Sequence, residues 1–94
     1  MPSVNKTIDV RFAVRLYYER IWLTNDDIKK LFNINSSSTL ARYRRQVLDY
    51  FADRNTNPLH RNNKLDTWKA YEAWGLDIEE LEKRLRKLQK LNLQ

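Results

Sequence analysis

Apolar positions along most of this chain recur at intervals of three and four, which is the spacing of one face of an α-helix. The first such stretch spans residues 7–22, where Ile8 and Phe12 share a face and Thr7 or Asn5 is a suitable cap. One glycine and two prolines occur in 94 residues, so the residues that separate short strands are scarce. The pattern therefore predicts a mostly helical protein of the all-α class.

Two shorter helical patterns follow, with an asparagine-rich break between them. In residues 23–32, Thr24 and Asp27 have the spacing of a helix-capping pair, and an acid suits the first turn of a helix dipole. Asn33 tolerates the left-handed backbone that ends a helix. A third helix is predicted from residue 36 or 37 to about residue 52. Leu40, Tyr43, Val47, Leu48 and Phe51 fit one apolar stripe of this helix.

A small hairpin and a fourth helix are predicted after the third helix. Residues 59–65 are predicted to form the hairpin, or wing, because Asn62 and Asn63 can supply the positive φ angles of its turn. The fourth helix, residues 67–74, precedes Gly75, which suits the left-handed position after a helix.

The last two helices carry the large apolar side chains of the C-terminal half. Trp68 and Trp74 are expected to anchor the core, because a buried indole removes a large apolar area from water. A fifth helix begins after Asp77, with acids before cations, as a helix dipole favours. Its leucine stripe is expected either to pack on the domain's own core or to pair with a second copy as a homodimer. The residues predicted for oligomerisation are Ile78, Leu81, Leu85 and Leu88.

Charge and composition favour a polyanionic partner, and they argue against a disulfide-bonded, membrane or secreted protein. The formal net charge is +6, and a basic balance of this size favours polyanions such as nucleic acid. The chain has no cysteine, which excludes disulfides and cysteine zinc sites. No apolar run approaches the roughly 18 residues of a membrane span, and the first residues lack the apolar run of a secretory signal. We expect a cytoplasmic protein with no membrane partner.

An enzymatic role is not expected. The sequence has no glycine-rich phosphate loop, no cluster of metal-ligating side chains and no histidine partner for a nucleophile. His60 is the only histidine, and a lone loop histidine is a poor candidate for a metal ligand or a catalytic base. We therefore predict no catalytic residue, no metal, no cofactor and no small-molecule ligand.

The second and third predicted helices, joined by a short turn, form the pattern of a helix-turn-helix. In that motif the second helix enters the major groove of DNA with its first residues against the bases. Short hydroxyl side chains would let the helix start approach DNA closely, and long polar side chains further along would reach bases or phosphates. The residues predicted to contact DNA in these two ways are Ser37, Ser38, Thr39, Arg42, Arg44, Arg45 and Gln46.

The segment LTNDDIKKLFNI, followed by SSSTLARYRR, resembles the helix-turn-helix of bacterial and phage DNA-binding proteins. Asn33 stands in place of the family's turn glycine, and Lys29 stands where a small residue is usual. The turn is also longer by one residue, which leaves the base-facing positions of the third helix open by one residue. The matching positions are Leu23, Thr24, Ile28, Leu31, Ile34, Ser38, Thr39, Leu40, Arg42, Tyr43 and Arg44.

A wider resemblance includes the hairpin. In MerR-like and excisionase-like proteins, a small wing and then a helix with a terminal tryptophan follow the helix-turn-helix, and LHRNNKLDTWKAYEAW is similar to that order. The resemblance implies that Arg61 and Lys64 are wing cations over phosphates or a minor groove. The leucine-rich last helix is also similar to that of phage regulatory and packaging proteins, including small terminase subunits. A phage or mobile-element factor that binds double-stranded DNA in a bacterial cytoplasm is therefore implied.

We predict one domain of five helices. Residues 1–75 form the DNA-binding helix-turn-helix unit with its small wing, and residues 76–94 form an amphipathic helix for assembly or packing. An alternative stays open, in which the arginines of the third helix are a solvated face paired with Asp49 and Asp53. The hydroxyl run is then only a cap, and the protein is a helical protein–protein interaction module that uses its leucine stripe and binds no DNA.

Overall fold

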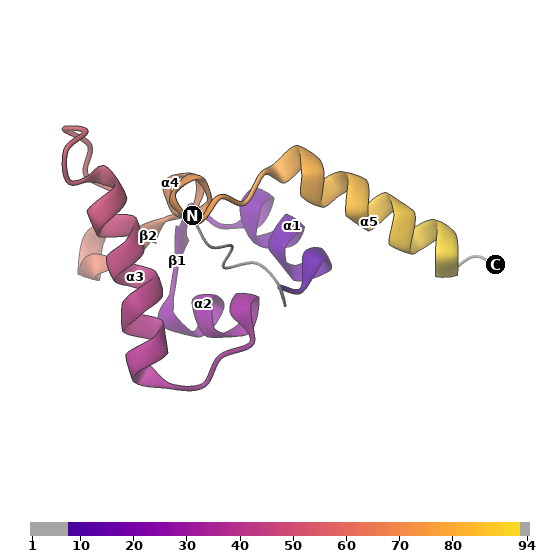
Figure 1. Ribbon diagram of the computed structural model, residues 1–94, viewed down its shortest axis with the longest axis horizontal. Coiled ribbons are helices and arrows are strands. Elements are labelled where there is room, and N and C mark those ends of the chain that lie inside the picture. The colour runs from indigo at the N-terminus through magenta and orange to yellow at the C-terminus, as the bar shows by residue number, and fades with distance from the viewer. Residues whose placement is uncertain (1–7, 93–94) are drawn as a thin grey trace.

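The computed structural model describes residues 8–92, and within that range the chain is mostly helical with one small antiparallel sheet (Figure 1). The predicted fold class, with its small wing, is confirmed. In chain order the elements are α1 (Val10–Glu19), β1 (Trp22–Leu23), α2 (Asn25–Phe32), α3 (Ser37–Phe51), the 3₁₀ turn η1 (Arg61–Asn63), β2 (Leu65–Asp66), α4 (Thr67–Trp74) and α5 (Ile78–Asn92).

The first helix begins later than predicted. Its first residue is Val10, and the Asp9 carboxylate caps it by accepting a hydrogen bond from the Phe12 backbone N–H at 3.1 Å. Such an acceptor satisfies one of the amide groups that have no partner within a helix. Thr7 and Asn5, the predicted caps, lie outside the described residues.

The first helix also ends earlier than predicted, at Glu19, where the backbone becomes extended. Trp22–Leu23 pair with Leu65–Asp66 as the two-stranded sheet, and the Thr67 N–H donates to the Ile21 carbonyl at 3.0 Å. The prediction that the helix reaches residue 22 is wrong, because a strand ladder and a helix need different backbone angles. The sheet joins the segment before α2 to the segment before α4.

The predicted ends of the central helices are confirmed. The Thr24 hydroxyl accepts from the Asp27 N–H and the Asp27 carboxylate accepts from the Thr24 N–H, each at 3.1 Å, which is a reciprocal capping box. Asn33 ends α2 with left-handed φ and ψ angles of 55° and 53°, and Ser36 caps α3. After α4, Gly75 has a φ of 75°, the backbone conformation that commonly terminates a helix.

The core lies between the helices and the small sheet, and aromatic rings fill much of it. Tyr71 is buried, and its hydroxyl donates to the Ala13 carbonyl at 2.6 Å. Trp74 is buried, and its indole N–H donates to the Tyr43 carbonyl at 3.0 Å. Phe32 of α2 stacks on Tyr43 of α3 with ring centroids 4.2 Å apart. These contacts confirm the predicted core positions of Trp74 and Tyr43.

The prediction that Trp68 is a core residue is wrong. Its side chain is 63 % exposed and stacks on Tyr17 of α1, with ring centroids 5.5 Å apart. The indole N–H donates to the Tyr17 carbonyl at 3.1 Å. Its neighbours Thr67 and Ala70 take the inward positions instead. One residue turns a helix by about 100°, so a small error in helical phase moves a side chain from the core to the surface.

The fifth helix packs its first half on α1 and projects beyond the rest of the fold (Figure 1). The whole molecule, with this helix, measures 46 × 27 × 27 Å. Leu81 is buried in the common core, and Ile78 and Leu85 are half-buried. Leu88 and Leu91 are 44 % and 66 % exposed. The leucine stripe therefore serves the domain's own core in its first turns and faces solvent in its last ones.

Candidate nucleic-acid interface

The second and third helices are held together by a short turn and an aromatic contact. The turn consists of residues 33–36, and the Asn33 N–H bonds carbonyls near the end of α2. The stacked rings of Phe32 and Tyr43 join the two helices, and Val47 of α3 faces the same core. The opposite side of α3 is left to solvent.

The four hydroxyl residues at the start of α3, residues 36–39, have different roles. The Ser36 hydroxyl accepts from the backbone N–H groups of Ser38 and Thr39 at 3.2 and 3.4 Å and lies 2.8 Å from the Ser38 hydroxyl. Thr39 is half-buried, whereas Ser37 and Ser38 are exposed. Capping therefore explains Ser36, while Ser37 presents its hydroxyl at the positive end of the helix dipole.

Arg42 and Arg45 lie on the outer face of α3, and both are exposed. Among the described residues, neither forms an ion pair with Asp49 or Asp53. Ala41, which is small and exposed, leaves the helix surface beside them open. No ion pair therefore links this face to these acids, although Asp49 lines the same hollows as Arg45.

Gln46 lies at the margin of the arginine face. Its side chain is half-buried. It lines a shallow hollow together with Ala73 of α4 and with Arg42, Arg45, Asp49 and Tyr50 of α3. The helical rotation between Arg45 and Gln46 turns the glutamine toward α4 and away from the centre of the exposed face.

Arg44 links α3 to two other elements. Its Nη2 donates to the Asn63 carbonyl at 2.6 Å, and its Nη1 donates to the Asn25 side-chain oxygen at 3.3 Å. Asn25 is the first residue of α2, and Asn63 lies in the wing. The planar guanidinium presents several donors in a fixed geometry, so one side chain can bridge two acceptors. Arg44 therefore positions the wing against α2 and α3.

The segment between α3 and α4 forms the predicted wing. The His60 N–H donates to the Lys64 carbonyl at 2.7 Å, and the Lys64 N–H closes the turn onto the Arg61 carbonyl at 3.4 Å. Asn62 and Asn63 at the tip have φ angles of 60° and 59°. Two successive positive φ angles are the mark of a type I′ turn, and asparagine accepts them more readily than most residues. The predicted hairpin and the role of its asparagines are confirmed.

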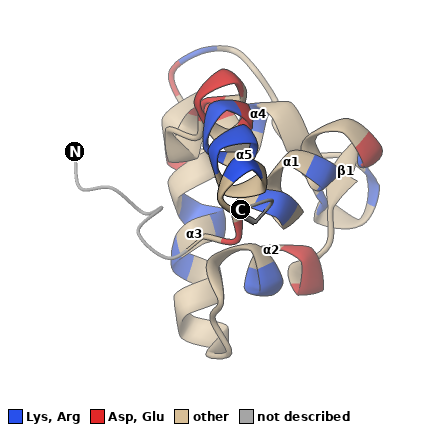
Figure 2. Cartoon of the chain, turned by 90° about the vertical axis from the view of Figure 1, so that its right-hand side faces the viewer, with Lys and Arg blue, Asp and Glu red and all other residues tan. Residues whose placement is uncertain are grey.

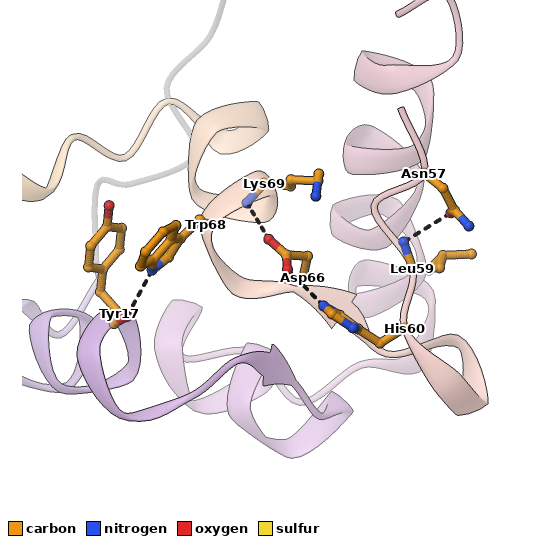
Figure 3. A network of polar contacts seen from close by, with 7 residues as sticks. All are labelled: Tyr17, Asn57, Leu59, His60, Asp66, Trp68 and Lys69. Carbon is orange, nitrogen blue, oxygen red and sulfur yellow. Dashed lines mark hydrogen bonds and ion pairs between the residues drawn. The ribbon is translucent and has the colours of Figure 1, made fainter. Parts of the chain in front are cut away.

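Polar and aromatic contacts fix the base of the wing (Figure 3). Asp66 Oδ1 lies 2.7 Å from His60 Nε2, and Asp66 Oδ2 accepts from the Lys69 N–H at 3.0 Å. One carboxylate therefore caps α4 and holds the wing histidine. On the other side, the Lys64 Nζ lies 5.2 Å from the centroid of the Trp22 ring, a distance at which a cation and an aromatic face attract. The wing is thus tied to both α4 and β1.

Three neighbouring hollows share residues and form one surface. Ser37, Arg44 and Arg45 line the first, beside α3. Arg44 and Lys64 line the second, between α2, α3 and the wing. Lys64 and Arg61 line the third, along the wing. We call this the α3–wing surface. It consists of the hollow-lining residues Ser37, Arg44, Arg45, Arg61 and Lys64, together with Ser38 and Arg42, which are exposed beside them on α3.

Two residues of this region were missed from the sequence. Asn25 accepts a hydrogen bond from Arg44, and Trp22 lies beneath Lys64. Asn25 is an ordinary residue for a helix start, and the apolar pattern places Trp22 in the first helix. Both roles arise from contacts with distant parts of the chain, which local periodicity does not report.

A second group of cations lies on α5, away from the α3–wing surface. Figure 2 looks toward the C-terminal end of α5 and shows Lys and Arg on its turns, while α3 also carries basic positions. The two helices lie at opposite ends of the longest dimension of the molecule (Figure 1). The cations of α5 are Lys83, Arg84, Arg86, Lys87 and Lys90.

Residues 8–92 contain no group of three or more His, Cys, Asp or Glu side chains placed to hold a metal ion. Over the same range, no helix is both long and apolar enough to cross a membrane. The chain matches no protein-family model, and it has no significant similarity to curated proteins or to solved structures. The function is therefore argued from the residues and geometry of the α3–wing surface.

Proposed function

We propose that this chain binds double-stranded DNA as a winged helix-turn-helix protein. In this proposal α3 lies in the major groove, and the wing lies along the adjacent phosphate backbone or minor groove. One observation supports it most. Arg42 and Arg45 are exposed without an acidic partner among the described residues, and Arg44 holds the wing beside the same helix.

The residues of α3 have the chemistry that this role needs. The exposed Ser37 and Ser38 side chains are short, so the start of the helix can approach phosphates closely. Arg42 and Arg45 have the length and charge to contact phosphates, or guanine O6 and N7 in the major groove. Gln46, at the margin of the face, has the donor and acceptor pair that suits adenine.

The wing contributes phosphate contacts from Arg61 and Lys64 in this proposal. Arg44 already uses N–H groups to bind Asn63 and Asn25 within the protein. We therefore assign Arg44 mainly to positioning, and we assign Arg42, Arg45, Arg61 and Lys64 to direct contact with the DNA.

By its resemblance, the protein would be a phage or mobile-element factor in a bacterial cytoplasm. Transcription regulation, excision and DNA packaging all use small helix-turn-helix proteins that bind DNA without catalysis. We propose this class of non-enzymatic DNA-binding factor, with no cofactor and no small-molecule ligand.

A protein–protein interaction module is the second candidate function. The exposed Leu88 and Leu91 favour it, because an apolar stripe on a projecting helix is a surface for another helix. The two candidates differ in their response to salt. Binding through phosphates weakens steeply as salt rises, whereas burial of apolar surface is not screened by salt.

Fluorescence anisotropy of a labelled random-sequence duplex tests the proposal. Four phosphate contacts predict a slope of about −3.6 for log affinity against log salt, so binding should weaken on the order of a hundredfold between about 50 and 200 mM salt. Arg42→Ala/Arg45→Ala should remove about half of that slope. Arg84→Ala/Lys87→Ala on α5 is the matched control and should keep it. Failure of the folded protein to bind at the lower salt would contradict the proposal.

A further inference from the structure

The distal half of α5 combines an uncovered apolar edge with charge of one sign. Leu88 and Leu91 are largely exposed on it. Between residues 83 and 92 the sequence contains five cations and no acid. A surface of this kind calls for a partner that offers both apolar contact and negative charge.

The first turns of the same helix, with the adjoining end of α1, offer negative charge and an apolar surface. The acids Asp77, Glu79, Glu80 and Glu82 lie in or just before its first turns, and no cation lies among them. Tyr18 of α1 is 62 % exposed. Its helix α1 is in contact with α5, and the pKa of its hydroxyl is raised, first by desolvation and then by the carboxylate of Glu82. An exposed ring and a group of carboxylates therefore adjoin each other.

We propose that α5 pairs antiparallel with α5 of a second copy of this chain. A helix whose acids all precede its cations attracts its copy when the two run antiparallel and repels it when they run parallel. In this arrangement the positive end of each helix dipole also lies beside the negative end of the other, which is favourable. A two-fold axis near Lys83, where the acidic part of the helix meets the basic part, sets Arg84, Arg86 and Lys87 of each copy against Glu82, Glu80 and Glu79 of the other. The same axis brings Leu88 and Leu91 onto the first turns of the partner helix, near its Tyr18.

The exposed leucines argue against DNA as the occupant of this face. A phosphate backbone would neutralise the cations but leave Leu88 and Leu91 in water. A two-fold contact covers them on both copies at once, as isologous interfaces do. The pairing does not depend on the proposed DNA binding, because α3 and the wing lie at the other end of the molecule (Figure 1).

Sedimentation equilibrium of the full chain over a concentration series, at about 50 and 500 mM salt, tests the pairing. We expect a monomer–dimer equilibrium whose dimer fraction falls at the higher salt. Lys87→Glu/Lys90→Glu should abolish the dimer, because acids then face acids. Adding Glu79→Lys/Glu80→Lys to that variant should restore it, because the two halves again carry opposite charge. Leu88→Asp, a single exposed change, should also give a monomer.

Arg42→Glu/Arg45→Glu is the control for charge. It alters the net charge as much as Lys87→Glu/Lys90→Glu does, but on α3, so it should lose DNA binding and still dimerise like the wild type. A wild type that stays monomeric throughout the series would overturn the pairing. So would a dimer that persists in Lys87→Glu/Lys90→Glu or in Leu88→Asp, or a fourfold variant that is helical by circular dichroism and yet monomeric.

Discussion

The Arg44 guanidinium donates a hydrogen bond to the Asn63 carbonyl across 2.6 Å, and this contact joins the third helix to the tip of the wing. The bond is charge-assisted, which makes it stronger than a neutral one. It leaves the wing held at its tip by α3 and at its base by Asp66. The relative position of the two predicted DNA-contacting parts therefore depends on Arg44 at the tip and on the contacts at the base.

Substitution of Arg44 should change the position of the wing more than the stability of the domain. For Arg44→Ala we expect a loss of about 1 kcal/mol or less in the free energy of unfolding, because the bond is at the surface. Amide resonances of Asn62, Asn63 and Lys64 should shift, and DNA affinity should fall by about tenfold. Arg44→Lys should not restore the wing resonances, since an ammonium group lacks the planar fork. Unchanged wing resonances in Arg44→Ala would refute the bridging role.

An acid at the start of α3 should affect folding and DNA binding in opposite directions. Ser37→Asp places a negative charge in the first turn, where the dipole stabilises it by about 0.3–1 kcal/mol. The same charge should repel phosphates and lower DNA affinity. Thermal unfolding and anisotropy measure the two effects, with Ser37→Ala as the control without charge. Tighter DNA binding by Ser37→Asp would mean that the start of α3 does not face the backbone.

The wing turn should tolerate only residues that accept positive φ angles. Asn62→Gly should retain the stability and DNA affinity of the wild type, because glycine adopts this backbone freely. Asn62→Val should cost about 1–2 kcal/mol locally, because a side chain in the left-handed region meets the backbone. Hydrogen exchange of the Lys64 amide, which closes the turn, should accelerate in Asn62→Val. Equal exchange in both variants would contradict the turn assignment.

Burial of Tyr71 predicts a loss of stability in alkali. Burial raises the pKa of its hydroxyl well above its ordinary value, and the carboxylate of Asp27 adds to the shift. The folded state therefore keeps this proton when the unfolded chain loses it. Stability from this group is complete below the unfolded pKa of about 10 and declines as the pH rises above it.

The Tyr71→Phe variant separates this effect from other alkaline changes. It should lose about 1 kcal/mol at neutral pH, because the hydrogen bond to the Ala13 carbonyl is removed. Its free energy of unfolding should then fall less steeply than that of the wild type above pH about 10. Urea titrations at a series of pH values measure both. Identical slopes would show that Tyr71 does not govern the alkaline limit.

The helix ends were predictable because each depends on a few residues close in sequence. The Thr24–Asp27 pair, Asn33 and Gly75 act through local backbone bonds and angles, and these residue types have strong local preferences. The wing turn was predictable for the same reason, since Asn62 and Asn63 supply its positive φ angles.

Contacts between distant segments were not predictable. The strand at Trp22 forms only because residues 65–66 pair with it, and its apolar character fits a helix equally well. Trp68 is a large apolar residue of the kind found in cores. Its position around the axis of α4, however, places its side chain at the surface, stacked on Tyr17. The bridging role of Arg44 likewise depends on Asn63, which lies 19 positions away.

An NMR titration of the ¹⁵N-labelled protein with a short duplex tests the central claim most directly. If the α3–wing surface binds DNA, the amide shifts should concentrate at the start and outer face of α3 and along residues 61–64. Resonances of α5 should change little, and the shifts should reverse when salt is raised. Shifts confined to α5, or no shifts at low salt from the folded protein, would contradict the assignment of α3 and the wing as the DNA-binding surface.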